Sequence, residues 1–185
     1  MSNYRRAHTE GGTYFFTVVT YRRRVILTLP ESRVALRNAI EEVRIQYPFA
    51  VDAWVLLPDH LHCLWQLPVG DKDYSKRWGL IKSRFTKRTK HLFQRDEWMS
   101  DSKRRHHEGT LWQRRFWEHQ IKDEADYRAH MDYIHFNPVK HGLVDSVIEW
   151  PYSTFHRYMR NGVYEPNWGG GGCEVSGEFG EAIDG

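Results

Sequence analysis

The sequence predicts an α+β fold in which a four-stranded antiparallel sheet is combined with helices. Segments rich in β-branched and aromatic residues alternate along the chain with segments whose apolar residues recur at helical spacing. Glycine, proline and acidic turn residues separate these segments. The chain has 185 residues, of which 40% are apolar and 15% aromatic, enough for one folded domain with a substantial core.

The first half of the chain has the order strand, helix, strand, strand. Residues 13–21, TYFFTVVTY, are rich in β-branched and aromatic side chains and follow two glycines, which predicts the first strand. Apolar residues then recur at helical spacing from Pro30 onward, and Pro48 ends this helix. Residues 49–57, FAVDAWVLL, form a second strand. A tight Pro-Asp turn joins it to a third strand within residues 57–68, LPDHLHCLWQLP.

The second half adds a helix, a fourth strand and a further helix. Residues 73–92 place apolar side chains near one face and leave lysines and arginines largely outward, as in a basic amphipathic helix. Residues 94–110 lose this periodicity and indicate a long, mobile, polar loop. Residues 114–121 form a fourth strand, and a helix over residues 124–137 ends at the following proline. The order matches the ferredoxin-like β-α-β-β-α-β arrangement, with helices on one face of the antiparallel sheet plus an extra C-terminal helix.

Charge is distributed unevenly along the chain. All 27 Lys and Arg residues lie before residue 161, whereas five of the 24 Asp and Glu residues lie after it, so residues 1–160 carry +8 and the remainder −5. A basic body rich in aromatic residues suits nucleic acid, where cations meet phosphates and rings stack on bases. A solvated surface would carry the same charge, and composition alone leaves both interpretations open.

Residues 1–168 are expected to form one domain, and residues 169–185, rich in glycine and acidic residues, a disordered tail. This tail either solubilises the protein or folds back on the basic surface and competes with nucleic acid. The N-terminus lacks the apolar core of a signal peptide, no later run could span a bilayer, and only two cysteines occur. We therefore expect a soluble cytoplasmic protein with reduced thiols.

The third strand carries two histidines at the spacing of a chelating pair. Successive side chains of a strand alternate between its faces, so His60 and His62 project side by side while Leu61 faces the other way. One histidine on a strand is more often a hydrogen-bonded core residue, but a pair on one face can bind a cation. Such a cation would need a third protein ligand and open positions for a substrate.

The last predicted helix offers a third ligand. Tyr133 and Asn137 are four residues apart and share one helical face. If this face covers the histidine strand, the amide oxygen of Asn137 completes a metal site and the Tyr133 hydroxyl lies beside it as a nucleophile. Taken singly, Tyr133 also suits a core position, and Asn137 suits the end of a helix before proline.

Six segments together carry a resemblance to a known family: YRR at 4–6, GGTYFFTV at 11–18, AWVLLPDHLHCLWQLP at 53–68, WQRRFWEH at 112–119, DYIHFNPVKHGLV at 132–144 and WPYSTFHR at 150–157. The chain resembles the HUH single-tyrosine transposases, named for their His-hydrophobic-His motif, and within them the REP-associated tyrosine transposases of bacteria. The resemblance covers most of residues 3–168. It implies that Tyr133 is the nucleophile, that His60 and His62 are metal ligands, and that Asn137 takes a third-ligand place that relatives often fill with Gln.

The resemblance implies metal-dependent cleavage and strand transfer of single-stranded DNA beside a REP-type palindromic hairpin with a flanking tetranucleotide. The tyrosine would form a 5′-phosphotyrosine link and release a 3′-OH, which can later attack that link without ATP. Mixed imidazole and amide ligands suit Mg²⁺ or Mn²⁺, although imidazole also accepts Zn²⁺. A cation such as Lys140 would help to deprotonate Tyr133, and a phosphate clamp or a solvated helix end is an equal alternative for Lys140.

Basic and aromatic residues beside the first strand, on the second helix and at the end of the last helix are candidate DNA contacts. Each also suits an ordinary solvated surface, but as a group they favour DNA binding. The candidates are Tyr4, Arg5, Arg6, Arg22, Arg23, Arg24, Lys82, Arg84, Lys87 and Lys140.

Two other functions share parts of this pattern. A rolling-circle replication initiator or relaxase also uses two histidines and a tyrosine, but such proteins usually have a longer chain or a helicase. A non-catalytic module could bind single-stranded DNA or RNA on the same sheet, with His60 and His62 as structural residues. The sequence indicates no protein partner, and we expect a monomer that works at the nucleoid.

Overall fold

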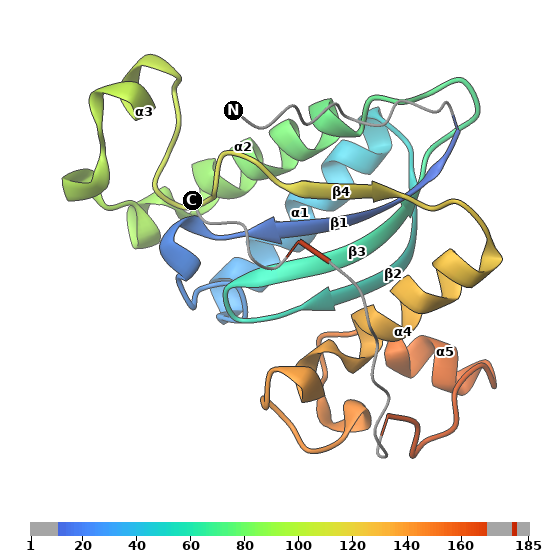
Figure 1. Ribbon diagram of the computed structural model, residues 1–185. Helices are drawn as coiled ribbons and strands as arrows, with labels where there is room; N and C mark the ends of the chain where they lie inside the picture. The colour runs from blue at the N-terminus through green and yellow to red at the C-terminus, as the bar shows by residue number, and fades with distance from the viewer. Residues whose placement is uncertain (1–10, 170–178, 181–185) are drawn as a thin grey trace.

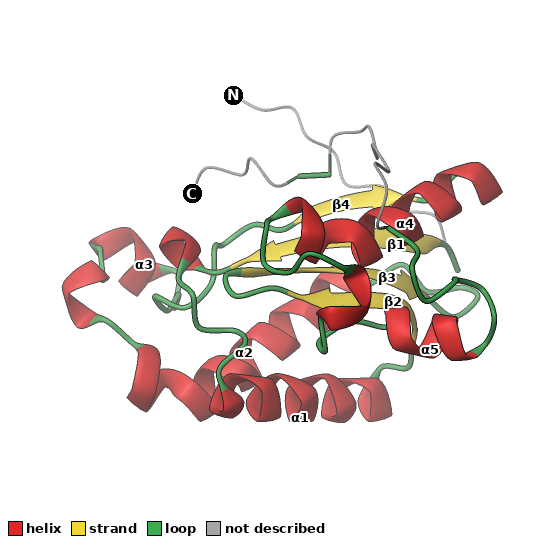
Figure 2. Ribbon diagram, turned by 90° about the horizontal axis from the view of Figure 1, so that it is seen from below, coloured by secondary structure: helices red, strands yellow, loops and turns green. Residues whose placement is uncertain are grey.

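A four-stranded antiparallel sheet lies between two layers of helices (Figure 2). The computed structural model describes residues 11–169 and 179–180. Helices α1 (Pro30–Gln46) and α2 (Tyr74–Phe93) cover one face of the sheet, and α4 (Glu124–Lys140) lies on the other face. Within the described ranges, no helix is both long and apolar enough to cross a membrane.

Each strand of the sheet is antiparallel to its neighbours (Figure 1). From one edge to the other the strands are β2 (Ala50–Leu56), β3 (His60–Gln66), β1 (Thr13–Val19) and β4 (Trp117–Gln120). The chain order β1, α1, β2, β3, α2, β4, α4 confirms the predicted β-α-β-β-α-β arrangement and its extra helix. Short helices fill the connections: η1 (Tyr21–Arg23), η2 (Asp96–Trp98), α3 (Asp101–Arg105), η3 (Val147–Glu149) and α5 (Phe155–Arg160).

The fourth strand is shorter than the predicted 114–121. Residues 114–116 leave the ladder, and Phe116 packs into the core beside Phe16, with 5.9 Å between ring centroids. Pairing with β1 begins only at Trp117. The alternation of apolar and polar residues does not reveal where β4 begins, because Phe116 is buried whether or not it belongs to the strand.

Both faces of β3 are buried, and its side chains alternate between two cores. Leu61, Cys63 and Trp65 point toward α1 and α2, where the Trp65 ring stacks on Trp78 with 4.2 Å between centroids. Leu64 belongs to the other core, under α4. Burial raises the pKa of the Cys63 thiol, so this side chain remains an uncharged thiol at neutral pH.

The prediction that the basic residues of α2 face outward is wrong for Arg77. This side chain is 1% exposed, and its guanidinium donates to the Asp71 carboxylate at 2.6 and 3.0 Å. It also donates to the carbonyls of Tyr47 and Pro48 after α1. A guanidinium has five N–H donors in a planar fork, so one side chain can serve a carboxylate and several carbonyls at once. The hydrogen bond from Arg77 holds the pKa of the Asp71 carboxyl below its usual value.

Helix α4 continues past Pro138, contrary to the prediction that it ends there. It runs to Lys140, because a proline in the last turn removes only one intrahelical hydrogen bond. The N–H of Gly142 donates to the carbonyl of Val139 at 2.9 Å, and the N–H of Leu143 to the carbonyl of Pro138 at 2.9 Å. Gly142 has a φ of 64°, the left-handed conformation that favours glycine just after a helix. The glycine, rather than the proline, is therefore the stop signal.

Residues 94–110 form a folded segment rather than the predicted mobile loop. They contain η2 and α3, and side chains join the two ends of the segment. The N–H of Arg95 donates to the Thr110 hydroxyl oxygen at 2.9 Å, and the Thr110 hydroxyl donates to the side-chain oxygen of Gln94 at 3.2 Å. Polar hydrogen bonds, rather than an apolar face, hold this segment, so hydrophobic periodicity does not reveal it.

Replacing Asp71 with Asn tests the buried ion pair. We expect D71N to lower the free energy of unfolding at pH 7 by about 2 kcal/mol, because the Arg77 guanidinium loses a charged partner. The folded-state pKa of Asp71 lies below the ordinary 3.8, so the stabilisation is present above about pH 4 and is lost as the pH falls through the folded-state pKa. The difference between the proteins should therefore shrink in acid.

Urea denaturation at pH 7 and pH 3 measures both effects. Glu41→Gln, at an exposed position of α1, is the control and should change the free energy of unfolding by less than about 0.5 kcal/mol. An equal loss in both variants would contradict the assigned role of Asp71.

Candidate active site

His60 and His62 lie side by side on β3, on the face that α4 covers. Their side chains are almost completely buried, and their ring centroids are 4.9 Å apart. Alternation along the strand therefore places two imidazoles in one enclosed site.

Each imidazole uses Nδ1 for a bond to a neighbouring oxygen. Nδ1 of His60 lies 2.6 Å from Oδ1 of Asp59, and Nδ1 of His62 lies 2.8 Å from the hydroxyl of Thr17, its partner on β1. The Thr17 hydroxyl donates its single hydrogen to the carbonyl of Phe179 at 2.6 Å, so it accepts one from His62. The Asp59 carboxylate likewise accepts a hydrogen bond from Nδ1 of His60. Both rings thus carry hydrogen on Nδ1, so in the neutral imidazole it is Nε2 that holds the lone pair a metal ligand needs.

The remaining nitrogen of His60 fits a bound cation. Its Nε2 is buried and makes no hydrogen bond within the part of the chain that the structure describes. A buried polar atom in this state costs free energy until a partner binds it. Nε2 of His60 can therefore bind a ligand in this site.

Asp59 connects the imidazole pair to η1. One carboxylate oxygen accepts from His60, and the other accepts from Nη1 of Arg23 at 3.2 Å. Burial alone would raise the pKa of the Asp59 carboxyl, but the hydrogen bonds from His60 and Arg23 and the positive charge of Arg23 outweigh it and hold that pKa below its usual value. Asp59 is therefore ionised at neutral pH and orients the His60 ring.

Helix α4 passes over the imidazole pair. The Tyr133 ring lies 5.2 Å from the His62 ring, and the His141 ring at the end of the helix lies 5.1 Å from the His60 ring. Asn137 is buried and is four residues from both Tyr133 and His141, so it lies between them on the same face. The structure thus brings Tyr133 and Asn137 to the histidine strand, and it adds His141, which no sequence pattern marked.

Lys140 lies within hydrogen-bonding distance of the Tyr133 hydroxyl. Its Nζ donates to the phenol oxygen at 3.2 Å and lies 4.6 Å from the ring centroid. The two residues are two helical turns apart, so one face of α4 carries both. A cation at this distance favours the ionised form of a phenol.

Phe179, from the C-terminal tail, covers Tyr133. The two rings are stacked with 3.6 Å between centroids, and Tyr133 is 1% exposed. Gly180 follows directly against the Trp117 indole, where any side chain would overlap the ring. The predicted disorder of residues 169–185 concerns mainly positions outside the described residues. The described contacts of Phe179 include its stacked ring on Tyr133 and the hydrogen bond that its carbonyl accepts from the Thr17 hydroxyl.

One further cluster of metal-ligating side chains joins β4 to α4: His119, Asp126 and His130. The Asp126 carboxylate lies 2.8 Å from Nε2 of His119 and 3.1 Å from Nδ1 of His130. The two rings are stacked at 4.7 Å and nearly parallel, at 10°. Both rings contact the Asp126 carboxylate, so the cluster forms a hydrogen-bonded clamp between strand and helix.

Comparison with known proteins identifies the family. A family model described as "Transposase IS200 like" matches residues 9–137, well over half of the chain. A REP-associated tyrosine transposase of Escherichia coli (strain K12) is 46% identical over 172 residues, which span 92% of each chain. The chain belongs to the REP-associated tyrosine transposases.

Two more comparisons agree with this assignment. A relative from Haemophilus influenzae (strain ATCC 51907 / DSM 11121 / KW20 / Rd), named for the same family, is 43% identical over 170 residues, 92% of this transposase and 94% of the relative. The solved structure of a REP-associated tyrosine transposase bound to a REP hairpin matches with a TM-score of 0.76 and 44% identity. That match covers 97% of this transposase and 93% of the other chain. The predicted family and fold are thereby confirmed.

The fold brings some of the predicted DNA contacts to the candidate site and leaves others apart. In this transposase Arg23 reaches Asp59, and Lys140 reaches Tyr133. Two other basic side chains bind partners within the protein. Nζ of Lys82 donates to a backbone carbonyl at 2.9 Å, and the Arg84 guanidinium lies 3.8 Å from a carboxylate. The remaining candidates are Arg22 and Arg24 beside β1, Lys87, exposed on α2, and Tyr4, Arg5 and Arg6, which lie outside the described residues.

Removing the Phe179 ring should expose Tyr133. We expect Phe179→Ala to speed nitration of Tyr133 by tetranitromethane several-fold, because the ring that covers the phenol is gone. Mass spectrometry of peptides measures nitration at this position. Phe179→Leu keeps an apolar cover and is the control, expected to stay near wild type. Equal nitration of Tyr133 in wild type and F179A would show that the tail does not cover this residue in solution.

Proposed function

We propose that this transposase cleaves single-stranded DNA beside a palindromic hairpin and transfers the cleaved end through a phosphotyrosine on Tyr133. The observation that carries the proposal is the position of the Tyr133 side chain. Helix α4 holds it beside His62 of the imidazole pair, with the Lys140 ammonium 3.2 Å from its hydroxyl. The solved relative bound to a REP hairpin supports a hairpin substrate for this chain, and such a substrate implies work at the nucleoid.

We infer that His60 and His62, through Nε2, and Asn137, through its amide oxygen, would hold a divalent cation, Mg²⁺ or Mn²⁺. The Nδ1 contacts that fix both rings support this, as does the buried Nε2 of His60. Two imidazoles and one amide leave coordination positions for water and phosphate oxygens. When bound, the ion supplies Lewis-acid stabilisation of the charge on the non-bridging phosphate oxygens.

In the proposed reaction Tyr133 is the nucleophile and Lys140 stabilises its ionised form. The Tyr133 phenol first releases its proton to solvent. Its oxygen then attacks phosphorus in line with the P–O3′ bond, and that bond breaks as the leaving oxygen takes up a proton from solvent and becomes a 3′-OH. The 5′ phosphate is now esterified to Tyr133. Lys140 favours the ionised phenol before the attack and leaves a positive charge beside the new ester. Because one phosphodiester replaces another, a 3′-OH can reverse the step without ATP.

Phe179 has to leave the Tyr133 ring before this reaction. The stacked ring and the burial of Tyr133 leave a phosphate no approach to the phenol oxygen while the tail is in place. We infer that the DNA substrate displaces Phe179 on binding. The described part of the tail thus opposes DNA through the aromatic contact of Phe179 with Tyr133.

Tyr133→Phe tests the nucleophile. An oligonucleotide with a REP-type hairpin and single-stranded flanks is incubated with Mn²⁺ or Mg²⁺, and covalent adducts are detected on a denaturing gel. Wild type and Tyr127→Phe, which alters another α4 tyrosine, should form the adduct. Y133F should form none, because it lacks the attacking oxygen, and should bind the oligonucleotide as wild type does. An adduct in Y133F overturns the assignment, and binding without an adduct in wild type indicates a non-catalytic DNA-binding module.

Asp59→Asn tests the support of the metal site. We expect Mn²⁺ to bind D59N about 10- to 100-fold more weakly than wild type, because the His60 ring loses the carboxylate that orients it. Titration followed by the electron paramagnetic resonance of free Mn²⁺ measures this affinity without DNA. Glu41→Gln removes an acid outside the site and should bind Mn²⁺ as wild type does. Unchanged affinity in D59N would exclude Asp59 from the metal centre.

A further inference from the structure

Residues 95–107, here called the basic arm, project from one end of the molecule (Figure 1). The arm contains η2 and α3 and begins close to the end of α2. It carries four cationic side chains and two histidines against three acids, and most of these side chains are exposed. The reaction proposed above uses none of them, so their exposure has no explanation in that mechanism.

Cation–aromatic contacts attach the basic arm to η1. The guanidinium carbons of Arg22 and Arg24 lie 4.8 and 5.2 Å from the centroid of the Trp98 ring. Nζ of Lys103 lies 3.9 Å from the centroid of the Tyr21 ring. Because cations already occupy these rings, a nucleic-acid base has no ring here to stack on. The groups that remain for a ligand are guanidinium and imidazole.

The positive charges of this region are incompletely neutralised. Burial and the charge of Arg95 lower the pKa of Arg24, and the charge of Glu97 opposes them only in part. A polyanion would relieve this repulsion. Within the described ranges, four of these cations form no ion pair with an acid: Arg22, Arg95, Arg104 and Arg105.

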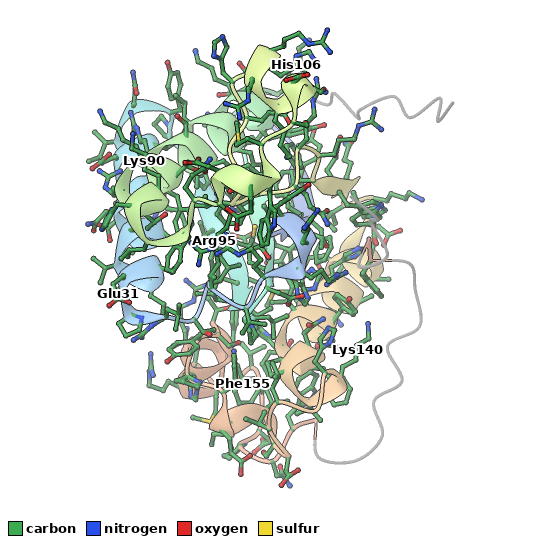
Figure 3. The ribbon with its side chains drawn as sticks, turned by 90° about the vertical axis from the view of Figure 1, so that its left-hand side faces the viewer. Glu31, Lys90, Arg95, His106, Lys140 and Phe155 are labelled. Carbon is green, nitrogen blue, oxygen red and sulfur yellow. The ribbon has the colours of Figure 1, made fainter. Side chains whose placement is uncertain are left out.

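The basic arm and the candidate active site lie on the same side of the molecule. Figure 3 faces this side, with His106 of the arm at one end, Lys140 toward the other end and Arg95 between them. The turn that supports the arm is also tied to the site, because Arg23 of η1 pairs with Asp59 at 3.2 Å. A nucleic acid bound at Lys140 could therefore continue along this side to the arm.

We propose that the basic arm binds the phosphate backbone of the paired hairpin stem while the adjoining single strand enters the site at Tyr133. The inference rests on the proposed function for the identity of the substrate. Guanidinium groups bind phosphate oxygens without reading bases, so the contact is independent of stem sequence. A duplex carries one negative charge per about 1.7 Å of its axis, which makes the stem the most highly charged part of a hairpin substrate.

The test compares two oligonucleotides: a hairpin with its single-stranded flank, and the flank alone. Fluorescence anisotropy over a series of salt concentrations measures binding. For R104Q/R105Q we expect about tenfold weaker binding of the hairpin at low salt. The slope of log K against log salt should become smaller by about 1.8, the loss expected for two phosphate contacts. Binding of the flank alone should match wild type.

The matched control is R37Q/K72Q, which removes two exposed charges outside the arm and should leave both affinities within about twofold of wild type. Thermal melting monitored by circular dichroism verifies that both double variants fold. An unchanged hairpin affinity in R104Q/R105Q overturns the proposal. An equal loss for the flank alone, or an equal loss in the control, overturns it as well.

The covalent adduct separates this proposal from the proposed function. If wild type forms no adduct at Tyr133 but hairpin binding depends on Arg104 and Arg105, the reaction is wrong and the arm assignment stands. If the adduct forms and hairpin binding does not depend on these arginines, the reaction stands and the arm assignment fails.

Discussion

The arrangement of this transposase depends on the register of β3, a strand that is buried on both faces. Leu61, Cys63 and Trp65 fill the core under α1 and α2, so the residues between them have to face α4. A slip of one residue would bury both imidazoles among apolar rings and turn leucine and cysteine toward Tyr133. The free energy of burying one face of the strand therefore fixes the orientation of the His60–His62 pair on the other.

The same register supplies a bonding partner for His62. Pairing of β1 with β3 sets Thr17 opposite His62, and the Thr17 hydroxyl has one hydrogen and two lone pairs. Because the Phe179 carbonyl takes the hydrogen, a lone pair is left to accept from Nδ1 of His62. If the tail leaves, the hydroxyl hydrogen loses this acceptor, but the oxygen can still accept from His62. Release of the tail thus uncovers Tyr133 without removing the support of the imidazole ring.

Sequence patterns predict those features whose cause is local. Strand alternation and helical spacing were enough to place two imidazoles on one face and Tyr133 with Asn137 on another, because both follow from backbone geometry. The same reasoning did not predict the burial of Arg77, because that burial depends on the Asp71 carboxylate and on carbonyls at the end of another helix. The contact of Phe179 with Tyr133 joins residues distant in the chain, and a lone aromatic residue in a glycine-rich, acidic tail was its only signal.

The turn after β1 shows why the imidazole pair and the basic surface belong to one unit. Arg22 and Arg23 both have positive φ, a conformation that costs free energy in residues other than glycine and persists only where surrounding contacts enforce it. Trp98 holds Arg22 on one side, and Asp59 holds Arg23 on the other. Since Asp59 also orients His60, the contacts that maintain the strained turn are the contacts that position a proposed metal ligand. The basic arm, through Arg22, and the site, through Arg23, are therefore supported by adjacent residues of the same turn.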